Sequence, residues 1–399
     1  MRVPLFGTVL FIVTAAAVAF YPALDSGGSI APSTRPAVEH PLADQRPVID
    51  VVFVLDTTGS MTGLIDAAKE KIWSIASSMA SAQPTPLIRI GLVGYRDRGD
   101  AYVTRMVDLS SDIDSTYATL MQFTAAGGGD TPESVNQALY DAVHRMAWSN
   151  EPNAYKVIFL VGDAPPHMDY PDDVKYPQTL AAAADKGIVV NTIQCGNDPQ
   201  TRQQWQQIAS RGRGAYFDVD QAGSAVALAT PYDADLAKLS AQLDATRMYY
   251  GTPEAKAKLH AKVEATDALH ALASAASQAR RAAFNATAAG EANAIGEGDL
   301  VTDIAAGKVD LANVAPAALP APMQGMSADE RKALVDQNAT VRADLEERIK
   351  TLAKQRDEYA ANRIAAQGGA KDSLDDQIYG AVREQAAKKG LVYPEAPKY

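Results

Sequence analysis

Cysteine is nearly absent from this chain: Cys195 is the only one among 399 residues, so no intramolecular disulfide can form. It follows an apolar run and is expected to be a small core residue. Aromatic residues amount to only 7%, and alanine is concentrated in the second half, which is therefore expected to pack thinly. Basic residues are not in excess either, because the net charge is −11. This charge argues against nucleic acid as a partner and suits a cation-binding protein.

The N-terminal segment predicts export. Arg2 precedes an uncharged stretch over residues 3–24, and Ala17-Val18-Ala19 fits a small-x-small cleavage site. We interpret residues 1–19 as a secretory signal of a bacterial protein, although the stretch is also long enough for an uncleaved anchor in the inner membrane. In either case we expect the rest of the chain to be periplasmic or secreted. Residues 20–46 contain proline, serine and glycine and are predicted to be a flexible leader.

Residues 47–225 alternate between strand and helix patterns. Near-continuous apolar runs predict strands, and amphipathic segments predict the helices between them. The predicted strands cover residues 48–55, 88–95, 102–109, 155–161, 188–193 and 215–219, and the predicted helices cover 64–79, 132–148, 174–186 and 200–210. This alternation is typical of an α/β fold with a doubly wound, mostly parallel sheet covered on both faces.

The C-terminal part is predicted to be α-helical. Residues 232–312 are alanine-rich, and residues 313–326 contain three prolines and are predicted to be a linker. Ser327 and Glu330 fit a capping box that opens a helix to about residue 366, and a final helix covers residues 372–389. Within the region 327–391, the spacing of apolar residues fits a coiled coil or helical hairpin, through which oligomerisation is possible, or one amphipathic surface helix; these residues are Leu334, Val341, Leu345, Ile349 and Leu352.

The first predicted strand ends in Asp56-Thr57-Thr58-Gly59-Ser60. In an extended loop alternate side chains point the same way, so the oxygens of Asp56, Thr58 and Ser60 can converge. Oxygen ligands suit hard cations such as Mg²⁺. Ligands of such sheets bind beyond the carboxyl ends of the strands, where the glycine-rich loop 127–133 and Asp163 are also expected.

These loops resemble the metal-ion-dependent adhesion site of the von Willebrand factor A (vWA) family, over roughly residues 46–222. Asp56, Thr58 and Ser60 match the family's Asp-x-Ser/Thr-x-Ser loop, and Asp163 matches its aspartate after the fourth strand. Many members use a threonine in the middle loop, which Thr131 matches and which we prefer. Glu133 stays open as well.

The case for Glu133 is that Asp130-Thr131-Pro132-Glu133 resembles the Asp-Ser-Pro-Glu loop of integrin β domains, where the glutamate binds the metal. The segment from Asp163 to His167 resembles a segment of the same domains, and we expect His167 to support the loop. Gly94-Tyr95-Arg96-Asp97 resembles the vWA domains of the alpha-kinase group, but no kinase segment is present. Integrin β chains place two carboxylates just after the signature, where this chain has Gly63 and Leu64, so a second adjacent metal is not expected.

The resemblance implies a metal-dependent adhesion module. One Mg²⁺ ion, or Mn²⁺ or Ca²⁺, would bind an exposed Asp or Glu of a protein partner. One alternative is an envelope scaffold that acts through the C-terminal helices. Another is a Mg²⁺-dependent hydrolase of phosphate esters, but the sequence shows no Walker loop, no Ser-His-Asp order and no His-Glu-x-x-His helix. We therefore expect no enzymatic activity.

Overall fold

Six strands form one sheet in the order β3-β2-β1-β4-β5-β6. The computed structural model describes residues 46–128, 131–219, 228–366 and 374–394, so the predicted signal and all but the last residue of the leader lie outside the described residues. The strands are β1 (Val48–Asp56), β2 (Leu87–Tyr95), β3 (Thr104–Ser110), β4 (Tyr155–Gly162), β5 (Ile188–Cys195) and β6 (Arg213–Val219). All pairs are parallel except β2 with β3. This confirms the mostly parallel α/β sheet expected from the sequence.

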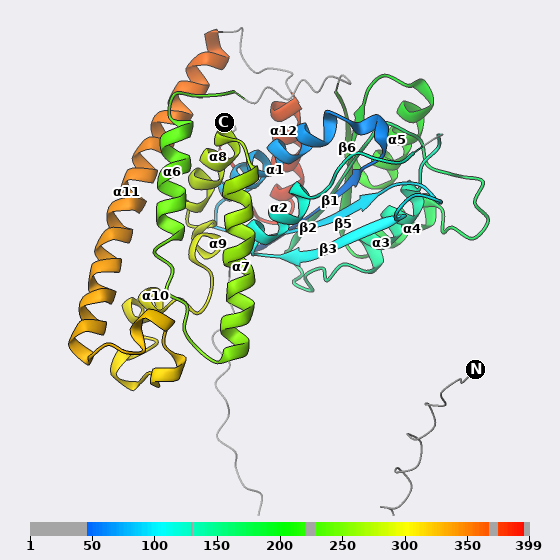
Figure 1. The fold of residues 1–399 in the computed structure, drawn as a ribbon. Helices are drawn as coiled ribbons and strands as arrows, with labels where there is room; N and C mark the ends of the chain where they lie inside the picture. Colours follow the sequence, from blue (N-terminus) through cyan, green and yellow to red (C-terminus); the bar gives the residue numbers. More distant parts are fainter. Residues whose placement is uncertain (1–45, 129–130, 220–227, 367–373, 395–399) are drawn as a thin grey trace, which may run out of the picture. The chain divides into compact units, whose positions relative to one another are not determined.

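Helices cover both faces of this sheet (Figure 1). One face carries α3 (Val135–His144), α4 (Tyr176–Asp185) and α5 (Pro199–Arg211), whose apolar side chains share a core with β1, β2, β4 and β5. The other carries α1 (Leu64–Ala80), α2 (Ile113–Met121) and α12 (Leu374–Ala387). Because both faces are covered, the central strands are buried along almost their whole length, which explains their near-continuous apolar sequences.

Two details differ from the sequence-based expectation. The helix predicted over residues 132–148 is shorter and begins at Val135, so Pro132 lies in the preceding loop and not in the first helical turn. Helix α2 was not predicted. It is only nine residues long, and its start is marked by Asp112, whose side chain accepts a hydrogen bond from the Ser115 backbone.

The C-terminal region is helical, as expected. It contains α6 (Asp233–Asp244), α7 (Pro253–Leu272), α8 (Ala275–Asn285), α9 (Glu291–Ile295), α10 (Leu300–Ala305) and α11 (Ala328–Ala366). The segment predicted as a linker forms two short 3-10 turns, Pro316–Ala318 and Ala321–Met323, and a third, Leu311–Asn313, ends at its first residue. Leu319 and Met323 are fully buried with Leu300 and Val335, so this segment packs against the helices.

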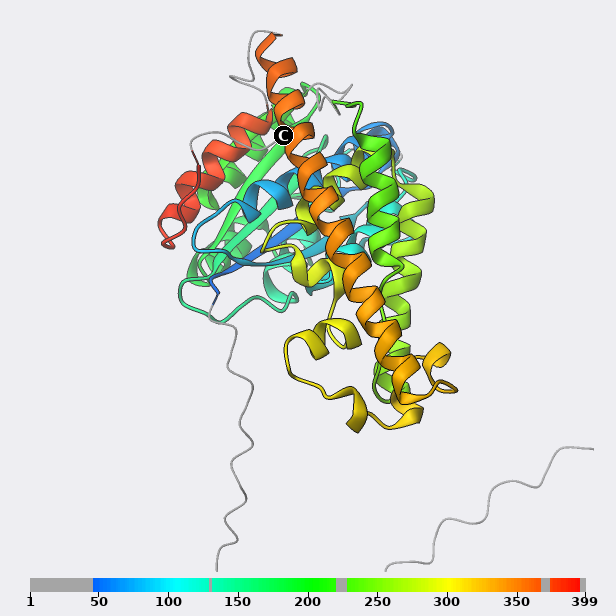
Figure 2. The same ribbon diagram turned by 90° about the vertical axis from the view of Figure 1, so that its left-hand side faces the viewer.

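The long helix α11 runs beside α6 (Figure 2). The capping box is confirmed, because the Ser327 backbone nitrogen donates to Glu330 Oε2 at 2.8 Å and the Glu330 nitrogen donates to Ser327 Oγ at 3.3 Å. Leu345 and Ile349 are buried in a core shared with α6 and α8, whereas Val341 is 43% exposed. Leu345 and Ile349 of α11 therefore pack within the chain, whereas Val341 does not.

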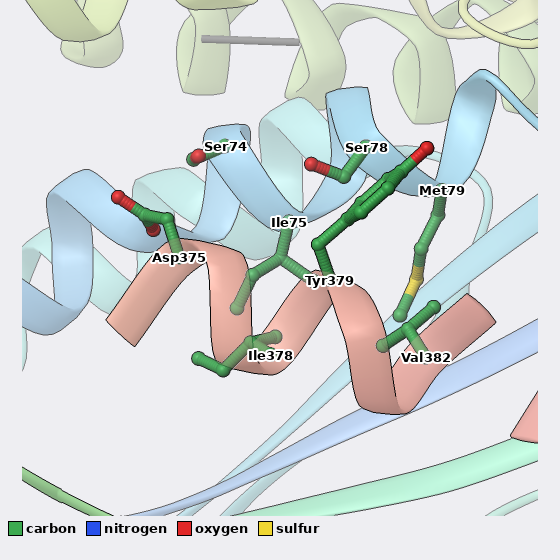
Figure 3. A pocket seen from close by; sticks show the side chains of 8 residues that line it. All are labelled: Ser74, Ile75, Ser78, Met79, Asp375, Ile378, Tyr379 and Val382. Atoms are coloured by element: carbon green, nitrogen blue, oxygen red, sulfur yellow. The ribbon is translucent and has the colours of Figure 1, made fainter. Parts of the chain in front are cut away.

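The last helix, α12, returns to the sheet. The Tyr155 hydroxyl on β4 donates to Gln385 Oε1 at 2.7 Å, and Ile378 and Val382 face Ile75 and Met79 of α1 (Figure 3). The space left between α1 and α12 is about 10 Å³, which is room for one water at most. The other C-terminal helices are thus an insertion between β6 and the helix that completes the sheet's cover. The chain from Arg46 onward clusters as one compact unit. Within the described ranges no helix is long and apolar enough to cross a membrane.

Candidate metal centre

The first loop of the candidate site lies where the strand order reverses. The chain runs outward from β1 through β2 to β3 and then crosses to β4 on the other side of β1. Asp56 ends β1 and Asp163 follows β4 directly, so both lie at the carboxyl edge of neighbouring strands. Ligands of doubly wound sheets bind at this switch point.

Four of the predicted ligands form one connected chain of oxygen atoms. Asp56 Oδ1 accepts from the Thr58 backbone nitrogen at 2.8 Å and from Thr58 Oγ1 at 2.6 Å. Thr58 Oγ1 lies 3.1 Å from Ser60 Oγ, which donates to Asp163 Oδ1 at 3.0 Å. Asp56 and Thr58 are buried, Asp163 is partly buried, and Ser60 is exposed. The structure thus brings Asp56, Thr58, Ser60 and Asp163 together in a site that opens to solvent beside Ser60.

The glycine-rich loop packs against this first loop. The Gly59 nitrogen donates to the Gly127 carbonyl at 2.9 Å. Gly128 has a φ of +66°, and a Cβ there would lie 3.0 Å from Thr58 Cβ and 3.1 Å from Glu133 Oε1. Only glycine fits this position well, since it needs both the left-handed conformation and the missing side chain. Its place between Thr58 and Glu133 puts the Glu133 carboxylate beside the first loop.

The two middle-loop candidates differ in their surroundings. The Glu133 side chain is buried, with its residue only 2% exposed, and its backbone nitrogen donates to the Pro165 carbonyl at 2.9 Å. Thr131 is exposed. The structure therefore places the carboxylate of Glu133, and not the hydroxyl of Thr131, in the buried part of the site. The sequence-based preference was for Thr131.

Two carboxylate oxygens of the site have no partner. Among the described residues, Asp56 Oδ2 and Glu133 Oε2 are buried and accept no hydrogen bond, and the Tyr95 hydroxyl is also buried without one. A Cβ on Gly162 would lie 2.4 Å from that hydroxyl and 3.1 Å from Asp56 Oδ2, so both atoms border the same small space. An unpartnered buried oxyanion is costly, and a bound cation would remove that cost.

Burial raises the pKa values of the acidic groups of the site when no cation is bound. It raises the pKa of Asp56 to about 7, with a further rise from the Asp163 charge, against which the Thr58 hydrogen bonds act. Burial also raises the pKa of Glu133 to about 9, aided by the charges of Asp56 and Asp97, and it raises the pKa of Asp163. Three carboxyl groups with raised pKa values favour a site that binds positive charge.

The donor set fits a hard divalent cation. Carboxylate and hydroxyl oxygens are the ligands that Mg²⁺ and Ca²⁺ take. In the part of the chain that the structure describes, no three His, Cys, Asp or Glu side chains lie close enough to hold a metal ion by themselves. The hydroxyl groups of Thr58 and Ser60 are therefore needed to complete the site.

A network of ring and hydrogen-bond contacts flanks Glu133. The His167 ring stacks on Tyr170 with 3.9 Å between centroids, and Asp97 accepts from the Tyr170 hydroxyl at 2.8 Å and from Ser134 Oγ at 2.7 Å. The His167 backbone nitrogen donates to the Glu133 carbonyl at 3.0 Å. His167 supports the loop, as expected. The place of Tyr95 beside Asp56 and the hydrogen bonds of Asp97 were missed, although both residues lie in the segment Gly94-Tyr95-Arg96-Asp97 noted in the sequence.

Comparisons with known proteins agree with this fold. Residues 50–231 match the family model described as von Willebrand factor A domain. The von Willebrand factor A domain-containing protein 7 of Mus musculus is 39% identical over 98 residues, which are 25% of this chain and 10% of that protein. Alpha-protein kinase vwkA of Dictyostelium discoideum is 27% identical over 129 residues, 30% of this chain and 19% of that protein. The chain thus spans only a small part of each relative's length.

A solved structure is similar over a comparable stretch. Proximal thread matrix protein 1 from the mussel byssus, with a zinc-occupied MIDAS motif, is 17% identical at a TM-score of 0.34 and covers 43% of this chain and 42% of that one. The family match and the six-stranded sheet together show that residues 50–231 of this chain are a von Willebrand factor A domain.

Proposed function

We propose that this chain is a metal-dependent protein-binding module that grips an acidic group of its partner through one divalent cation. Asp56, Thr58, Ser60, Glu133 and Asp163 would hold the ion, with Mg²⁺ the first choice and Mn²⁺ or Ca²⁺ as other hard cations. The observation that carries the proposal is the pair of buried, unpartnered carboxylate oxygens, Asp56 Oδ2 and Glu133 Oε2, beside two hydroxyl groups. A bound cation supplies an open coordination position for an outside carboxylate.

The geometry favours approach of the partner from the Ser60 side. Ser60 is exposed and Asp163 is partly buried, while Asp56, Thr58 and Glu133 are buried. Buried ligands can fix the ion, and the exposed side leaves room for a carboxylate from another protein. A short charge-assisted contact in a partly desolvated site is a suitable binding hot spot.

The proposal is a non-catalytic role outside the cytoplasm. Support for export comes from the arginine and apolar segment in residues 1–19, which lie outside the described residues. In the alternative form of this proposal, the same segment is not cleaved and tethers the chain to the membrane. Two of the helices between β6 and α12 pack on the sheet domain: α7 contacts α2, and α8 contacts α1. These contacts favour a role of the inserted helices in holding the vWA domain in place.

Calorimetric titration of the whole chain with MgCl₂, after dialysis against EDTA, tests the metal site. We expect saturable binding of one ion, abolished by Asp163→Ala. Asp185→Asn is the matched control, because Asp185 is exposed at the end of α4, next to the start of β5 and thus at the opposite edge of the sheet. Absence of heat with Mg²⁺, Mn²⁺ and Ca²⁺ alike would exclude the proposed site.

A second experiment tests the partner. Proteins captured from an envelope extract in Mg²⁺ should be released by EDTA and should not be captured by the Asp163→Ala variant. The Asp185→Asn variant should capture them like the wild type. A partner that stays bound in excess EDTA contradicts the cation-mediated contact even if the metal titration succeeds. Because residues after 230 include α12, which covers the sheet, such tests need the whole chain.

A further inference from the structure

A groove lies in the inserted helices. It has a volume of about 320 Å³ and lies between α8 and α9 on one side and α11 on the other, with α6 at its base. Figure 1 shows α11 alongside these shorter helices. The volume lies in the range of sites for small molecules, which is roughly 300–1,000 Å³.

The floor of this groove is apolar. Leu243 of α6, Ala294 and Ile295 of α9, and Ile349 of α11 line it and are buried, with exposures of 7% or less. Ala282 of α8 also lines the floor. Such a floor suits a hydrocarbon chain, because burying methylene groups there removes them from water.

The rim of the groove is acidic. Glu291 on α9 and Glu346 on α11 lie on opposite walls, and Glu347 lines the groove as well. Within the described residues neither Glu291 nor Glu346 forms an ion pair, and the same holds for Lys350, the one basic residue of the lining. Partial burial raises the pKa of Glu346, and the charge of Glu291 raises it further, while Arg342 acts in the opposite direction. The negative charges of Glu291 and Glu346 therefore repel each other across the groove.

We propose that this groove binds a small aliphatic amine, with its ammonium group between Glu291 and Glu346 and its hydrocarbon chain along the apolar floor. The opposed carboxylates match the charge of an ammonium group, and charge-assisted hydrogen bonds to both are among the stronger polar contacts. The apolar floor beside this pair of carboxylates suits the hydrocarbon part of an organic cation, which an inorganic ion does not have. This site is separate from the vWA metal centre.

Calorimetric titration of the whole chain with pentylamine at low ionic strength tests this proposal. Saturable binding of one amine per chain is expected. Glu346→Gln should weaken it about tenfold or more, because one charged acceptor is lost. Ala343→Phe should abolish amine binding, since Ala343 is exposed on α11 and a ring there would fill the groove without disturbing the core. Glu358→Gln is the control, because Glu358 is exposed on the same helix and does not line the groove.

The neutral analogue 1-pentanol separates charge recognition from apolar binding. It should give no measurable binding at the concentration that saturates the amine. Equal affinity of the wild type and the Glu346→Gln variant would show that the amine binds the acidic surface unspecifically, and equal binding of the alcohol would show that the glutamates do not select the ligand. Either result overturns the proposal. Unchanged thermal unfolding of the Glu346→Gln and Ala343→Phe variants establishes that a lost signal is not a loss of fold.

Discussion

The Arg281 guanidinium on α8 donates two hydrogen bonds of 2.6 Å to the two carboxylate oxygens of Asp114 on α2. Both side chains are fully buried. Arg281 Nη1 also donates to Asp244 of α6 at 2.8 Å, so one cation joins the sheet domain to two inserted helices. Nearby cations lower the pKa of Asp114 and Asp244 despite their burial. The inserted helices and the vWA domain are thus linked by buried charges as well as by apolar contacts.

Replacing Arg281 with methionine should destabilise the whole unit. The change leaves Asp114 and Asp244 with fewer counter-charges in a buried place, which typically costs about 3–5 kcal/mol. Urea unfolding measures the loss. Arg348→Met is the control, because Arg348 pairs with Asp344 on the exposed face of α11 and should change stability little. An unfolding curve with two separate transitions for the wild type would contradict the coupling.

Helix α12 should be needed for the stability of the sheet domain although it is distant in sequence. Ile378 is 5% exposed and faces α1, so Ile378→Ala removes buried methyl groups and should cost about 2–5 kcal/mol. Glu384→Ala, at an exposed position of the same helix, should change little. Thermal unfolding compares the two variants, and equal melting temperatures would show that α12 does not form part of the core.

The sequence predicts the local elements better than their partners. Strands such as β4 can be predicted, because burial on both faces requires a run of apolar residues. The convergence of Asp56, Thr58 and Ser60 can be predicted as well, because their spacing in one loop fixes their geometry. The packing of α12 on the sheet was not predictable, since nothing in the sequence of residues 374–387 indicates which strands the helix covers. Nor could the sequence decide between Thr131 and Glu133, because the choice depends on contacts of this loop with Thr58 and Pro165, which are distant from it in the sequence.

Glu133, and not Thr131, should prove essential for cation binding. Glu133→Gln keeps the size of the side chain but removes the charge, and should lower the affinity for Mg²⁺ about tenfold or more. Thr131→Val should leave the affinity unchanged, because Thr131 is exposed. Calorimetric titration of both variants beside the wild type decides the matter. The reverse pattern, with loss of binding only in Thr131→Val, would show that the middle loop rearranges around the ion.

Stabilisation by Mg²⁺ should be greater at pH 8 than at pH 5. Without the ion, burial raises the pKa of Asp56 to about 7 and that of Glu133 to about 9, above the unfolded values near 4. The stability that these groups contribute as neutral acids is therefore complete below pH 4 and is lost as the pH rises through 7 and 9. A divalent ion binds the charged forms and so must displace protons at low pH.

The measurement is the Mg²⁺-induced shift in melting temperature across this pH range. The shift should grow with pH in the wild type, be absent at every pH in Asp56→Ala, and be retained in Asp185→Asn. Metal binding should also release protons, which calorimetry in buffers of different ionisation enthalpy detects. A shift that is the same at pH 5 and pH 8 would mean that Asp56 and Glu133 are already ionised in the metal-free protein. Water would then solvate their carboxylates, and they would not be protonated.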